Sequence, residues 1–284
     1  MDQIFRVQRI PAPGETVLST GFSTAHGGKG QNQAVAAARA GASTEFISAL
    51  GSDGFGTAIR SGLEADGIGA TLVRELDAPT GTALIAVDDS GENTIIVEGG
   101  ANARLTGLTH ADESAIQAAS VLVMQLEIPL ETVEAAARVG RAAGTTVVLN
   151  AAPIRDLPDA LLGLLDILIV NEHEAEHLAA GRPGTDLTDL VPTVIVTLGA
   201  EGAVVYGRDA GEVRVPAPSV TAVDATGAGD TFCGALAAAL DEGQPIESAL
   251  RFAVTAASLS VEHHGAVPSI PRRAAIDERI ATEK

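Results

Sequence analysis

The sequence predicts a doubly wound α/β fold with a mostly parallel sheet and a small β-sheet lid. Apolar residues follow one another in runs such as Val121–Leu126 and Ile167–Asn171, a pattern typical of parallel strands buried on both faces. Helical patterns such as Leu130–Ala143 and Glu172–Ala180 lie between these runs. Because strands and helices alternate, we expect helices on both faces of the sheet. The other predicted core elements are strands at Thr44–Leu50, Thr145–Asn150 and Thr193–Leu198 and helices at Thr231–Asp241 and Arg272–Lys284.

Two segments interrupt this alternation and predict the lid. The first, Phe5–Phe22, carries two prolines and a glycine between short strand-like pieces. The second is a hairpin of Gly81–Asp88 and Thr94–Glu98 around a polar turn at residues 89–92. Strands with no helix between them do not fit a doubly wound core. We therefore predict a lid from residues 1–25 and 79–98, and an α/β core from residues 26–78 and 99–284.

Composition narrows the class of protein. The chain carries 37 acidic and 18 basic residues, a formal net charge of −19. Such a surface repels nucleic-acid phosphates and anionic membranes, so we expect neither as a partner. Cys233 is the only cysteine, which disfavours a disulfide framework and a cysteine-based zinc site. No apolar run reaches the roughly 18 residues of a membrane span, and no signal-peptide pattern is present, so we expect a cytoplasmic protein.

The most informative motif runs from Asp224 to Asp230 and opens a predicted helix. Its small residues Gly227, Ala228 and Gly229 allow backbone N–H groups to face one anion at the helix N-terminus. Asp230 at the mouth of that site could accept a proton from a hydroxyl while the amides hold a phosphoryl group. The alternative is that Asp230 only caps the helix.

A second glycine-rich stretch, Gly27-Gly28-Lys29-Gly30 with Gln31 and Asn32, precedes another predicted helix. Its backbone could approach a ligand closely, and the Lys29 and Asn32 side chains could donate to sugar hydroxyls. Glu127 follows a predicted strand, at the sheet edge where open α/β sheets bind ligands. A flexible loop and a solvated acid explain the same residues without a ligand.

A third group, Asn171 to Glu174, also follows a strand. Asn171 could contact a nucleotide phosphate, and Glu174 could orient water around Mg²⁺. A plain helix N-cap followed by acidic residues in the first turn explains the same residues.

Taken in order, these motifs resemble those of the ribokinase-like (PfkB) carbohydrate kinases over nearly the whole chain. The Asp224–Asp230 stretch is the most specific of them. The matching pieces are Pro13-Gly14-Glu15-Thr16, Gly27-Gly28-Lys29-Gly30 with Asn32, Met124-Gln125-Leu126-Glu127, Asn171 with Glu174, Thr197-Leu198-Gly199 with Gly202, Asp224 to Asp230, and Gly265 with Pro268 and Ser269.

The resemblance implies ATP-dependent phosphorylation of D-ribose at O5, giving D-ribose 5-phosphate. Asp230 would be the general base, and the amides of Gly227, Ala228 and Gly229 would stabilise charge on the transferring group. It further implies Mg²⁺ with ATP, an activating K⁺ and a homodimer formed through the lid. Sugar ligands would be Asp2, Gly28, Lys29, Gly30, Gln31, Asn32, Glu127 and Asp230; ATP ligands Asn171, Glu174, Thr197, Leu198, Gly199, Ala200, Glu201, Gly202, Gly229, Asp230 and Val254; and cation ligands Asp224, Thr226, Ser260, His263, Gly265 and Ser269.

The chain departs from the family pattern at two places. The family begins with an apolar core strand ending in Gly-x-Asn-x-Asp, whereas here Met1 and Asp2 stand at the end of that stretch. The resemblance therefore implies that the first core strand is missing, through a start codon assigned too late or a shortened chain. Val254 replaces a side chain that is often polar in the family, which implies altered nucleotide affinity.

Two other functions fit the same residues. The first keeps the chemistry but changes the acceptor to 2-deoxyribose, another sugar or a nucleoside. The second is a degenerate, non-catalytic protein that binds sugar or nucleotide, against which the retained Asp230 and anion loop argue.

Overall fold

The computed structural model describes residues 1–208 and 211–282, and within them six strands form the main sheet in the order β12-β11-β10-β9-β8-β7. Strands β7 to β10 run parallel, and β11 and β12 continue the sheet as antiparallel strands. The predicted mostly parallel sheet is therefore confirmed. The strands are β7 (Val121–Met124), β8 (Thr146–Asn150), β9 (Ile167–Asn171), β10 (Thr193–Thr197), β11 (Ala203–Gly207) and β12 (Gly211–Val215).

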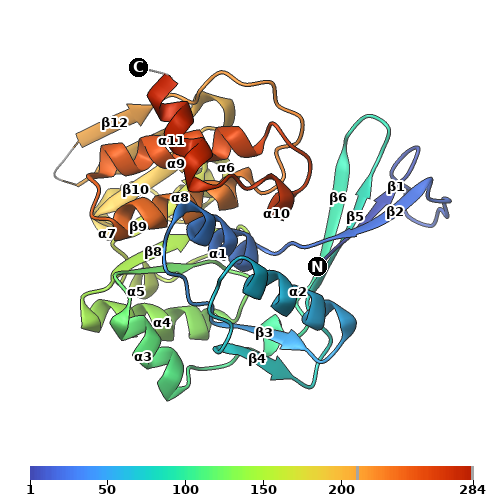
Figure 1. Ribbon diagram of the computed structural model, residues 1–284. Coiled ribbons are helices and arrows are strands. Elements are labelled where there is room, and N and C mark those ends of the chain that lie inside the picture. Colours follow the sequence, from blue (N-terminus) through green and yellow to red (C-terminus); the bar gives the residue numbers. More distant parts are fainter. Residues whose placement is uncertain (209–210, 283–284) are drawn as a thin grey trace.

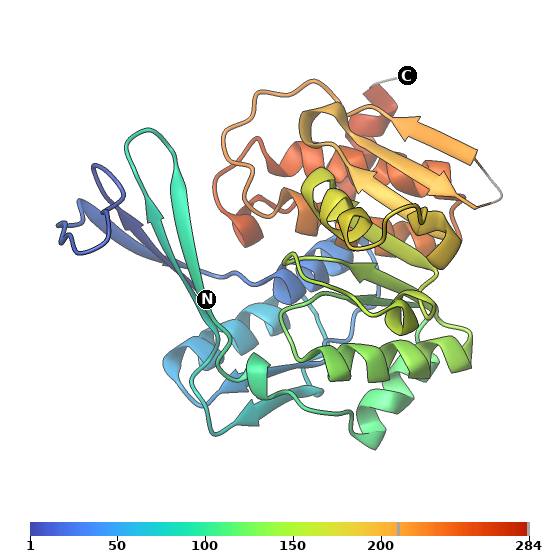
Figure 2. The same ribbon diagram turned by 180° about the vertical axis from the view of Figure 1, so that it is seen from behind.

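Helices cover both faces of this sheet (Figures 1 and 2). Neighbouring residues of one strand serve opposite faces: Ile167 and Ile169 pack with one helix layer, and Leu168 and Val170 with the other. This explains why the strands are apolar on consecutive residues. One layer contains α1 (Lys29–Ala40), α8 (Ala228–Asp241), α9 (Ile246–Ser260) and α11 (Arg273–Thr282); the other contains α3 (His110–Ala118), α4 (Leu130–Ala143), α5 (Asp159–Leu162) and α6 (Glu172–Ala180).

The predicted hairpin is confirmed as part of a separate sheet in the order β2-β1-β5-β6. This sheet projects from one side of the core, and the N-terminus lies at its base (Figure 1). Its strands β1 (Asp2–Arg6), β2 (Gly21–Ala25), β5 (Thr82–Val87) and β6 (Asn93–Glu98) fall within residues 1–25 and 79–98.

The core sheet is interrupted beside β7. Strands β3 (Ser48–Gly51) and β4 (Val73–Leu76) pair in parallel with each other, and in the described residues neither joins the main sheet. Residues from β3 and β7 line one cavity of about 1250 Å³. This gap, the space between β3 and β7, divides the core strands into two separate sheets.

Most boundaries lie within a few residues of those predicted. Helix α8 begins at Ala228 rather than Thr231, and the predicted strand Thr44–Leu50 begins only at Ser48. The last two residues of the predicted C-terminal helix, 283–284, lie outside the described residues. The remaining elements are α2 (Gly54–Ala65), α7 (Leu187–Leu190), α10 (Ala266–Ser269) and the 3₁₀ turns η1 (Asn102–Arg104) and η2 (Gly199–Glu201).

Candidate active site

The Asp224–Asp230 loop ends at the N-terminus of α8. Gly227 has φ of +76°, and a β-carbon there would lie 2.9 Å from the Ala266 Cβ, so both conformation and space require glycine. The first N–H groups of a helix have no acceptor within it. Ala228 donates its N–H to the Ala225 carbonyl at 3.2 Å, which ties one of the three expected amides into the turn. Gly229 faces open space, because nothing lies within 4 Å of where its β-carbon would be.

Asp230 is 7% exposed and lines the large cavity. Its two carboxylate oxygens accept hydrogen bonds from two side chains of α1. Asn32 Nδ2 donates to Oδ2 at 2.9 Å, and Gln33 Nε2 donates to Oδ1 at 3.0 Å. Helix α1 can present both side chains because Gly28, at φ +107°, turns the chain immediately before Lys29. The structure thus brings two distant predicted motifs to one carboxylate.

Two further carboxylates, Asp2 and Glu127, line the same cavity. The Lys29 backbone N–H donates to Glu127 Oε2 at 2.9 Å. Burial raises the pKa of Glu127 above its usual range, and the nearby Asp230 and Asp2 carboxylates add to that effect. Burial likewise raises the pKa of Asp2, which packs so closely on Gly27 that a β-carbon there would overlap its carboxylate.

Buried oxygens without a partner mark this cavity as a polar binding site. Among the residues that the structure describes, Gln31 Oε1 and Asn32 Oδ1 are buried and accept no hydrogen bond. Leaving such an acceptor unpaired costs about 1–3 kcal/mol. Both residues line the cavity, so hydroxyl groups of a bound ligand could satisfy these oxygens.

Asn171 and Glu174 form a capping box at the start of α6. Asn171 Oδ1 accepts from the Glu174 N–H at 2.8 Å, and Glu174 Oε2 accepts from the Asn171 N–H at 2.9 Å. Burial raises the pKa of Glu174. Asn171 and Glu174 therefore do cap the helix, each through one side-chain oxygen. The Asn171 amide nitrogen takes no part in the capping box.

Residues 197–202 form a tight turn after β10. Leu198 N donates to the Gly202 carbonyl at 2.8 Å, and both glycines of the turn have positive φ. Thr197, Leu198, Gly199, Ala200, Glu201 and Gly202 thus stand at the carboxyl end of β10, next to Asn171 at the end of β9.

Asp224 ties its own loop to the segment after α9. Its Oδ1 accepts from the Thr226 N–H and hydroxyl at 2.9 and 2.6 Å, and its Oδ2 accepts from the Gly265 N–H at 2.8 Å. Partial burial raises the pKa of Asp224, but these hydrogen bonds outweigh it and hold the pKa below its usual value. His263 lies exposed in the same segment.

Three of the predicted ligands have no free side chain at the cavity. Val254 is 3% exposed and packs in the core between α8, α9 and the sheet, so we leave it out of the site proposed below. Ser260 and Ser269 are buried and donate their hydroxyls to the carbonyls of Ala257 and Ala266, each at 2.8 Å. These hydrogen bonds use the hydroxyl protons, so either serine could offer a cation only oxygen lone pairs, of its hydroxyl or of its backbone carbonyl.

Sequence reasoning gave no role to four residues of the site: Gln33 and Gln125, which lie in or beside the quoted motifs, and Asn150 and Gly234. Gln33 bonds to Asp230, Gln125 and Asn150. A β-carbon on Gly234 would lie 2.3 Å from the Gln33 carbonyl oxygen, so this glycine lets α1 and α8 approach. Such contacts join segments about 100–200 residues apart. A short sequence motif cannot predict which of these segments meet.

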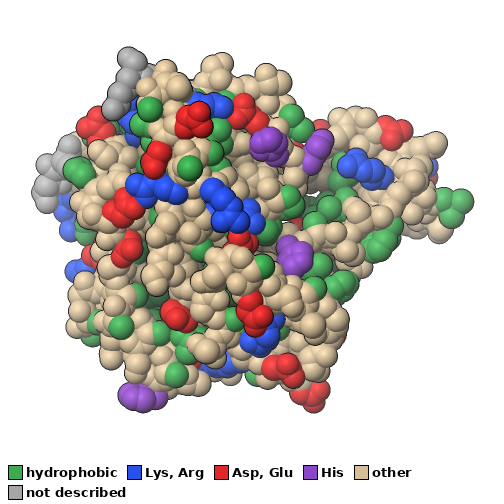
Figure 3. Space-filling model, in the orientation of Figure 1, with side chains coloured by type: hydrophobic (Ala, Val, Ile, Leu, Met, Phe, Trp, Pro, Cys, Tyr) green, Lys and Arg blue, Asp and Glu red, His purple; other side chains and the backbone are tan. Residues whose placement is uncertain are grey.

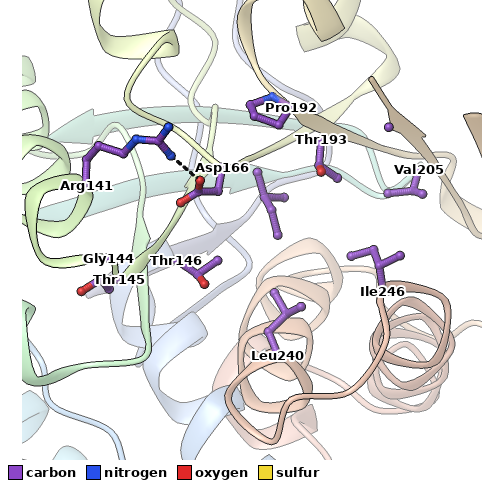
Figure 4. A pocket seen from close by; sticks show the side chains of 12 residues that line it. Arg141, Gly144, Thr145, Thr146, Asp166, Pro192, Thr193, Val205, Leu240 and Ile246 are labelled. Carbon is purple, nitrogen blue, oxygen red and sulfur yellow. Dashed lines mark hydrogen bonds and ion pairs between the residues drawn. The ribbon is translucent and has the colours of Figure 1, made fainter. Parts of the chain in front are cut away.

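A second cavity, of about 630 Å³, lies at the opposite, amino-terminal ends of β8, β9 and β10. Figure 4 shows Arg141 directed at Asp166, with which it forms an ion pair of 2.6 Å. Its charged groups already satisfy each other, and it lies away from all predicted site residues.

Within residues 1–208 and 211–282, no helix has the length and apolar character needed to cross a bilayer. The same residues contain no cluster of three or more His, Cys, Asp or Glu side chains suited to a metal ion.

Comparisons with known proteins agree with this geometry. Residues 1–273 match the family described as pfkB family carbohydrate kinase. The chain is 39% identical to the ribokinase of Haemophilus influenzae, over 96% of this chain and 92% of that protein. It is also 39% identical to the ribokinase of Bacillus subtilis, over 99% and 96%. The solved ribokinase of Arabidopsis thaliana in complex with ribose and ATP is 33% identical, with a TM-score of 0.90 over 98% of this chain and 94% of that one.

Proposed function

The chain belongs to the pfkB family of carbohydrate kinases, and we propose that it transfers the γ-phosphoryl group of ATP to O5 of D-ribose. The observation that carries the proposal is the position of Asp230. Its carboxylate lies at the N-terminus of α8, beside first-turn amides and on the wall of a cavity with unpaired buried acceptors.

The proposed reaction uses Asp230 as the general base. As O5 bonds to the γ-phosphorus, its proton passes to the Asp230 carboxylate, and the bond from that phosphorus to the β–γ bridging oxygen breaks to release ADP. The amides of Gly227 and Gly229, with Ala228 holding the turn, stabilise negative charge on the transferring group.

We assign the sugar to the part of the cavity between β1, α1 and Glu127. Gln31 Oε1 and Asn32 Oδ1 are available to accept from sugar hydroxyls, and Asp2 and Glu127 add carboxylate acceptors. Gly28, Lys29 and Gly30 supply close backbone approach at the start of α1.

We assign ATP to the ends of β9 and β10, through Asn171 and the turn at residues 197–202. An ATP-dependent kinase uses Mg²⁺ with its nucleotide. Glu174 keeps one carboxylate oxygen outside the capping box, which would suit a water bound to that ion. Held there, the ion would offset negative charge on the phosphates.

We also propose an activating monovalent cation, K⁺, beside the anion site. The Asp224 carboxylate joins the Thr226 turn to Gly265 by accepting hydrogen bonds from both backbone N–H groups. Carboxylate and carbonyl oxygens are the ligands that suit a hard cation. Carbonyl groups of the Ser260, His263, Gly265 and Ser269 segments would complete the ligand set. Bound there, the cation would offset negative charge near the phosphoryl group.

The lid is proposed as the dimer interface. Large apolar side chains are exposed on it, and Figure 3 shows hydrophobic atoms along the projecting sheet. Two lids packed together would cover these side chains. They are Leu18, Phe22, Leu84, Ile95, Ile96 and Val97. The boundaries of lid and core and the cytoplasmic location stay predictions.

Replacing the base tests the mechanism. We expect Asp230→Asn to lower kcat by roughly 10²–10⁴-fold with little change in ATP binding. The fold should tolerate this change, because Asn32 can turn its unpaired Oδ1 toward the new amide. ATP consumption with ribose measures kcat, and Asp189→Asn, on exposed α7, is the matched control. Near-normal turnover in Asp230→Asn would overturn the role of this residue.

The same assay identifies the acceptor. Ribose, 2-deoxyribose, fructose and adenosine are compared with and without K⁺. Faster turnover on ribose, stimulated by K⁺, is the expected result. Preference for another acceptor would redirect the substrate, and no turnover on any of them would favour a non-catalytic binding protein.

A further inference from the structure

A buried glutamine stands behind the carboxylate of Asp230. Gln33 is 3% exposed, and its side chain connects residues from three other parts of the chain. Its Nε2 lies 3.0 Å from Asp230 Oδ1 and 3.2 Å from Asn150 Oδ1, and its Oε1 lies 2.6 Å from Gln125 Nε2. Helix α1, strand β8, the end of β7 and helix α8 therefore meet at one amide group.

The contacts use the hydrogen-bonding capacity of the Gln33 amide nitrogen completely. An amide nitrogen has two N–H donors, and both have an acceptor here, one on Asp230 and one on Asn150. The oxygen of the same amide accepts from Gln125. The Gln33 side chain therefore has no N–H donor left for a substrate. Gln31 and Asn32 differ, because each keeps an unpaired oxygen that can accept a hydrogen bond.

The Asp230 carboxylate, which only accepts, and the Gln125 side chain, which donates to Gln33 Oε1, favour the same orientation of the Gln33 amide. If that amide were turned over, its oxygen would face the Asp230 and Asn150 oxygens, and its nitrogen would face the Gln125 nitrogen. Both contacts would be repulsive. The donor from Gln125 thus favours the orientation in which Gln33 donates to the carboxylate.

We propose that Gln33 is a positioning residue for Asp230, and that Gln125 acts through Gln33 to keep its donor facing that carboxylate. This inference rests on the proposed role of Asp230 as the base. With Asn32 on Oδ2 and Gln33 on Oδ1, the carboxylate plane is fixed from both sides. Hydrogen bonds donated to a carboxylate also favour its ionised form, which is the form that accepts a proton.

Other titratable groups lie near Asp230, and their influence on the kcat–pH profile must be distinguished from that of the Gln33 amide. Asp2 follows the N-terminus, Glu127 follows β7, Lys29 begins α1, and the Cys233 thiol lies one turn along α8. None of these is altered by a change at Gln33.

Gln33→Met tests the proposal, because methionine keeps the length and most of the volume of the side chain but cannot donate. We expect kcat for ribose to fall about tenfold and the acidic limb of the kcat–pH profile to move up by about one pH unit, as a hydrogen bond to a charged group is worth about tenfold or more. KM for ATP should change little. The matched control is Gln117→Met on the exposed face of α3, which should leave the profile in place.

Gln125→Met separates positioning from packing. It does not touch Asp230, so a shift of the acidic limb in the same direction, but smaller than in Gln33→Met, supports the proposal. Lower thermal stability in both variants with an unmoved acidic limb would overturn it and leave Gln33 a structural residue. Repeating Gln33→Met in a Glu127→Gln background must give the same shift, since a shift that vanished there would belong to Glu127.

Failure of this inference can be told from failure of the proposed function. If Asp230→Asn loses turnover but Gln33→Met keeps the wild-type profile, only the positioning role is wrong. If Asp230→Asn keeps turnover, the general base itself is wrong, whatever Gln33 does.

Discussion

Glu127 lies near two other carboxylates, Asp2 and Asp230, on the wall of the large cavity. Its Oε2 accepts from the Lys29 N–H, yet burial and the negative charges of Asp230 and Asp2 still raise its pKa. A carboxyl group with a raised pKa in the folded state binds its proton more tightly there than in the unfolded chain. Its contribution to stability is complete below the unfolded pKa and is lost as pH rises through the folded value.

We therefore expect Glu127→Gln to change how stability depends on pH. Glutamine keeps an acceptor for the Lys29 N–H but cannot ionise. Relative to the wild type, the variant should gain free energy of unfolding as pH rises from about 4.5, near the usual carboxyl pKa, to neutral. Urea unfolding at several pH values measures the difference, and Glu131→Gln, at the exposed start of α4, is the matched control. A constant difference between Glu127→Gln and wild type across this pH range would contradict the assignment.

Single residues differ in how far the sequence can predict them. Asp230 could be predicted because a short stretch of sequence, a glycine-rich turn followed by a helix, is enough to indicate its role. Gln33 could not, because its partners Gln125 and Asn150 are 92 and 117 residues away in the chain. Val254 was assigned by position in a motif, but the turn of α9 directs it into the core.

Helices α1 and α8 form the element pair on which the site depends. Both begin after a glycine with positive φ, and they pack side by side along most of their lengths. At Gly234, one turn after Asp230, a β-carbon would lie 2.3 Å from the Gln33 carbonyl oxygen and 2.7 Å from the Ala37 nitrogen. Backbone atoms cannot move aside as the end of a side chain can, so α1 itself would have to shift.

Gly234→Ala should therefore damage both stability and activity. Overpacking of this kind costs about 1–3 kcal/mol, more than the gain of about 1 kcal/mol in helix propensity that alanine brings. A displacement of about 1 Å of the groups that hold Asp230 can lower the rate about 100-fold. Urea unfolding and ribose-dependent ATP consumption measure the two effects.

Gly140→Ala in α4 is the matched control for this contact. Its β-carbon would meet only the side-chain ends of Val147 and Leu122, at 3.1 and 3.2 Å, and these can adjust. If Gly234→Ala were as stable and active as Gly140→Ala, close packing of α1 on α8 would not be what orders the site.

At the scale of elements, the sequence predicts helix interiors better than strand ends. Leu130–Ala143 and Glu172–Ala180 are confirmed residue for residue. The first has an apolar face and follows a proline, and the second follows the capping residue Asn171. The strand predicted at Thr44–Leu50 is shorter. Before Ser48 the segment forms only an isolated bridge, from Glu45 to Gly69. The apolar run in the sequence therefore begins earlier than the strand pairing does.

For the whole molecule, the order of strands and helices was enough to predict a doubly wound sheet with a lid. The composition could not predict that the chain would divide its core sheet into two separate ladders. Within the described residues no hydrogen bond of the sheet crosses from β3 to β7. The two parts are held together by helices and side chains instead.

We expect this division to appear in amide hydrogen exchange. Amides of β3 and β4 should exchange faster than those of β8 and β9, because the two-stranded ladder can open without breaking the main sheet. Protection factors measured by mass spectrometry on peptides from 48–51, 73–76, 146–150 and 167–171 test this. Equal protection in all four segments would mean that the core opens as one unit and that the gap does not weaken it.

The same gap has a consequence for how copies of the protein behave at high concentration. Strand edges with unpaired N–H and C=O groups can act as templates for another extended chain. β3 and β7 present two such edges, facing each other across one opening. A mobile or partly unfolded segment of a neighbouring copy could pair with both, so the first sign of instability should be aggregation rather than loss of helices. Aggregation of this kind would begin at the strand edges inside the core, and it would be distinct from the proposed pairing of lids.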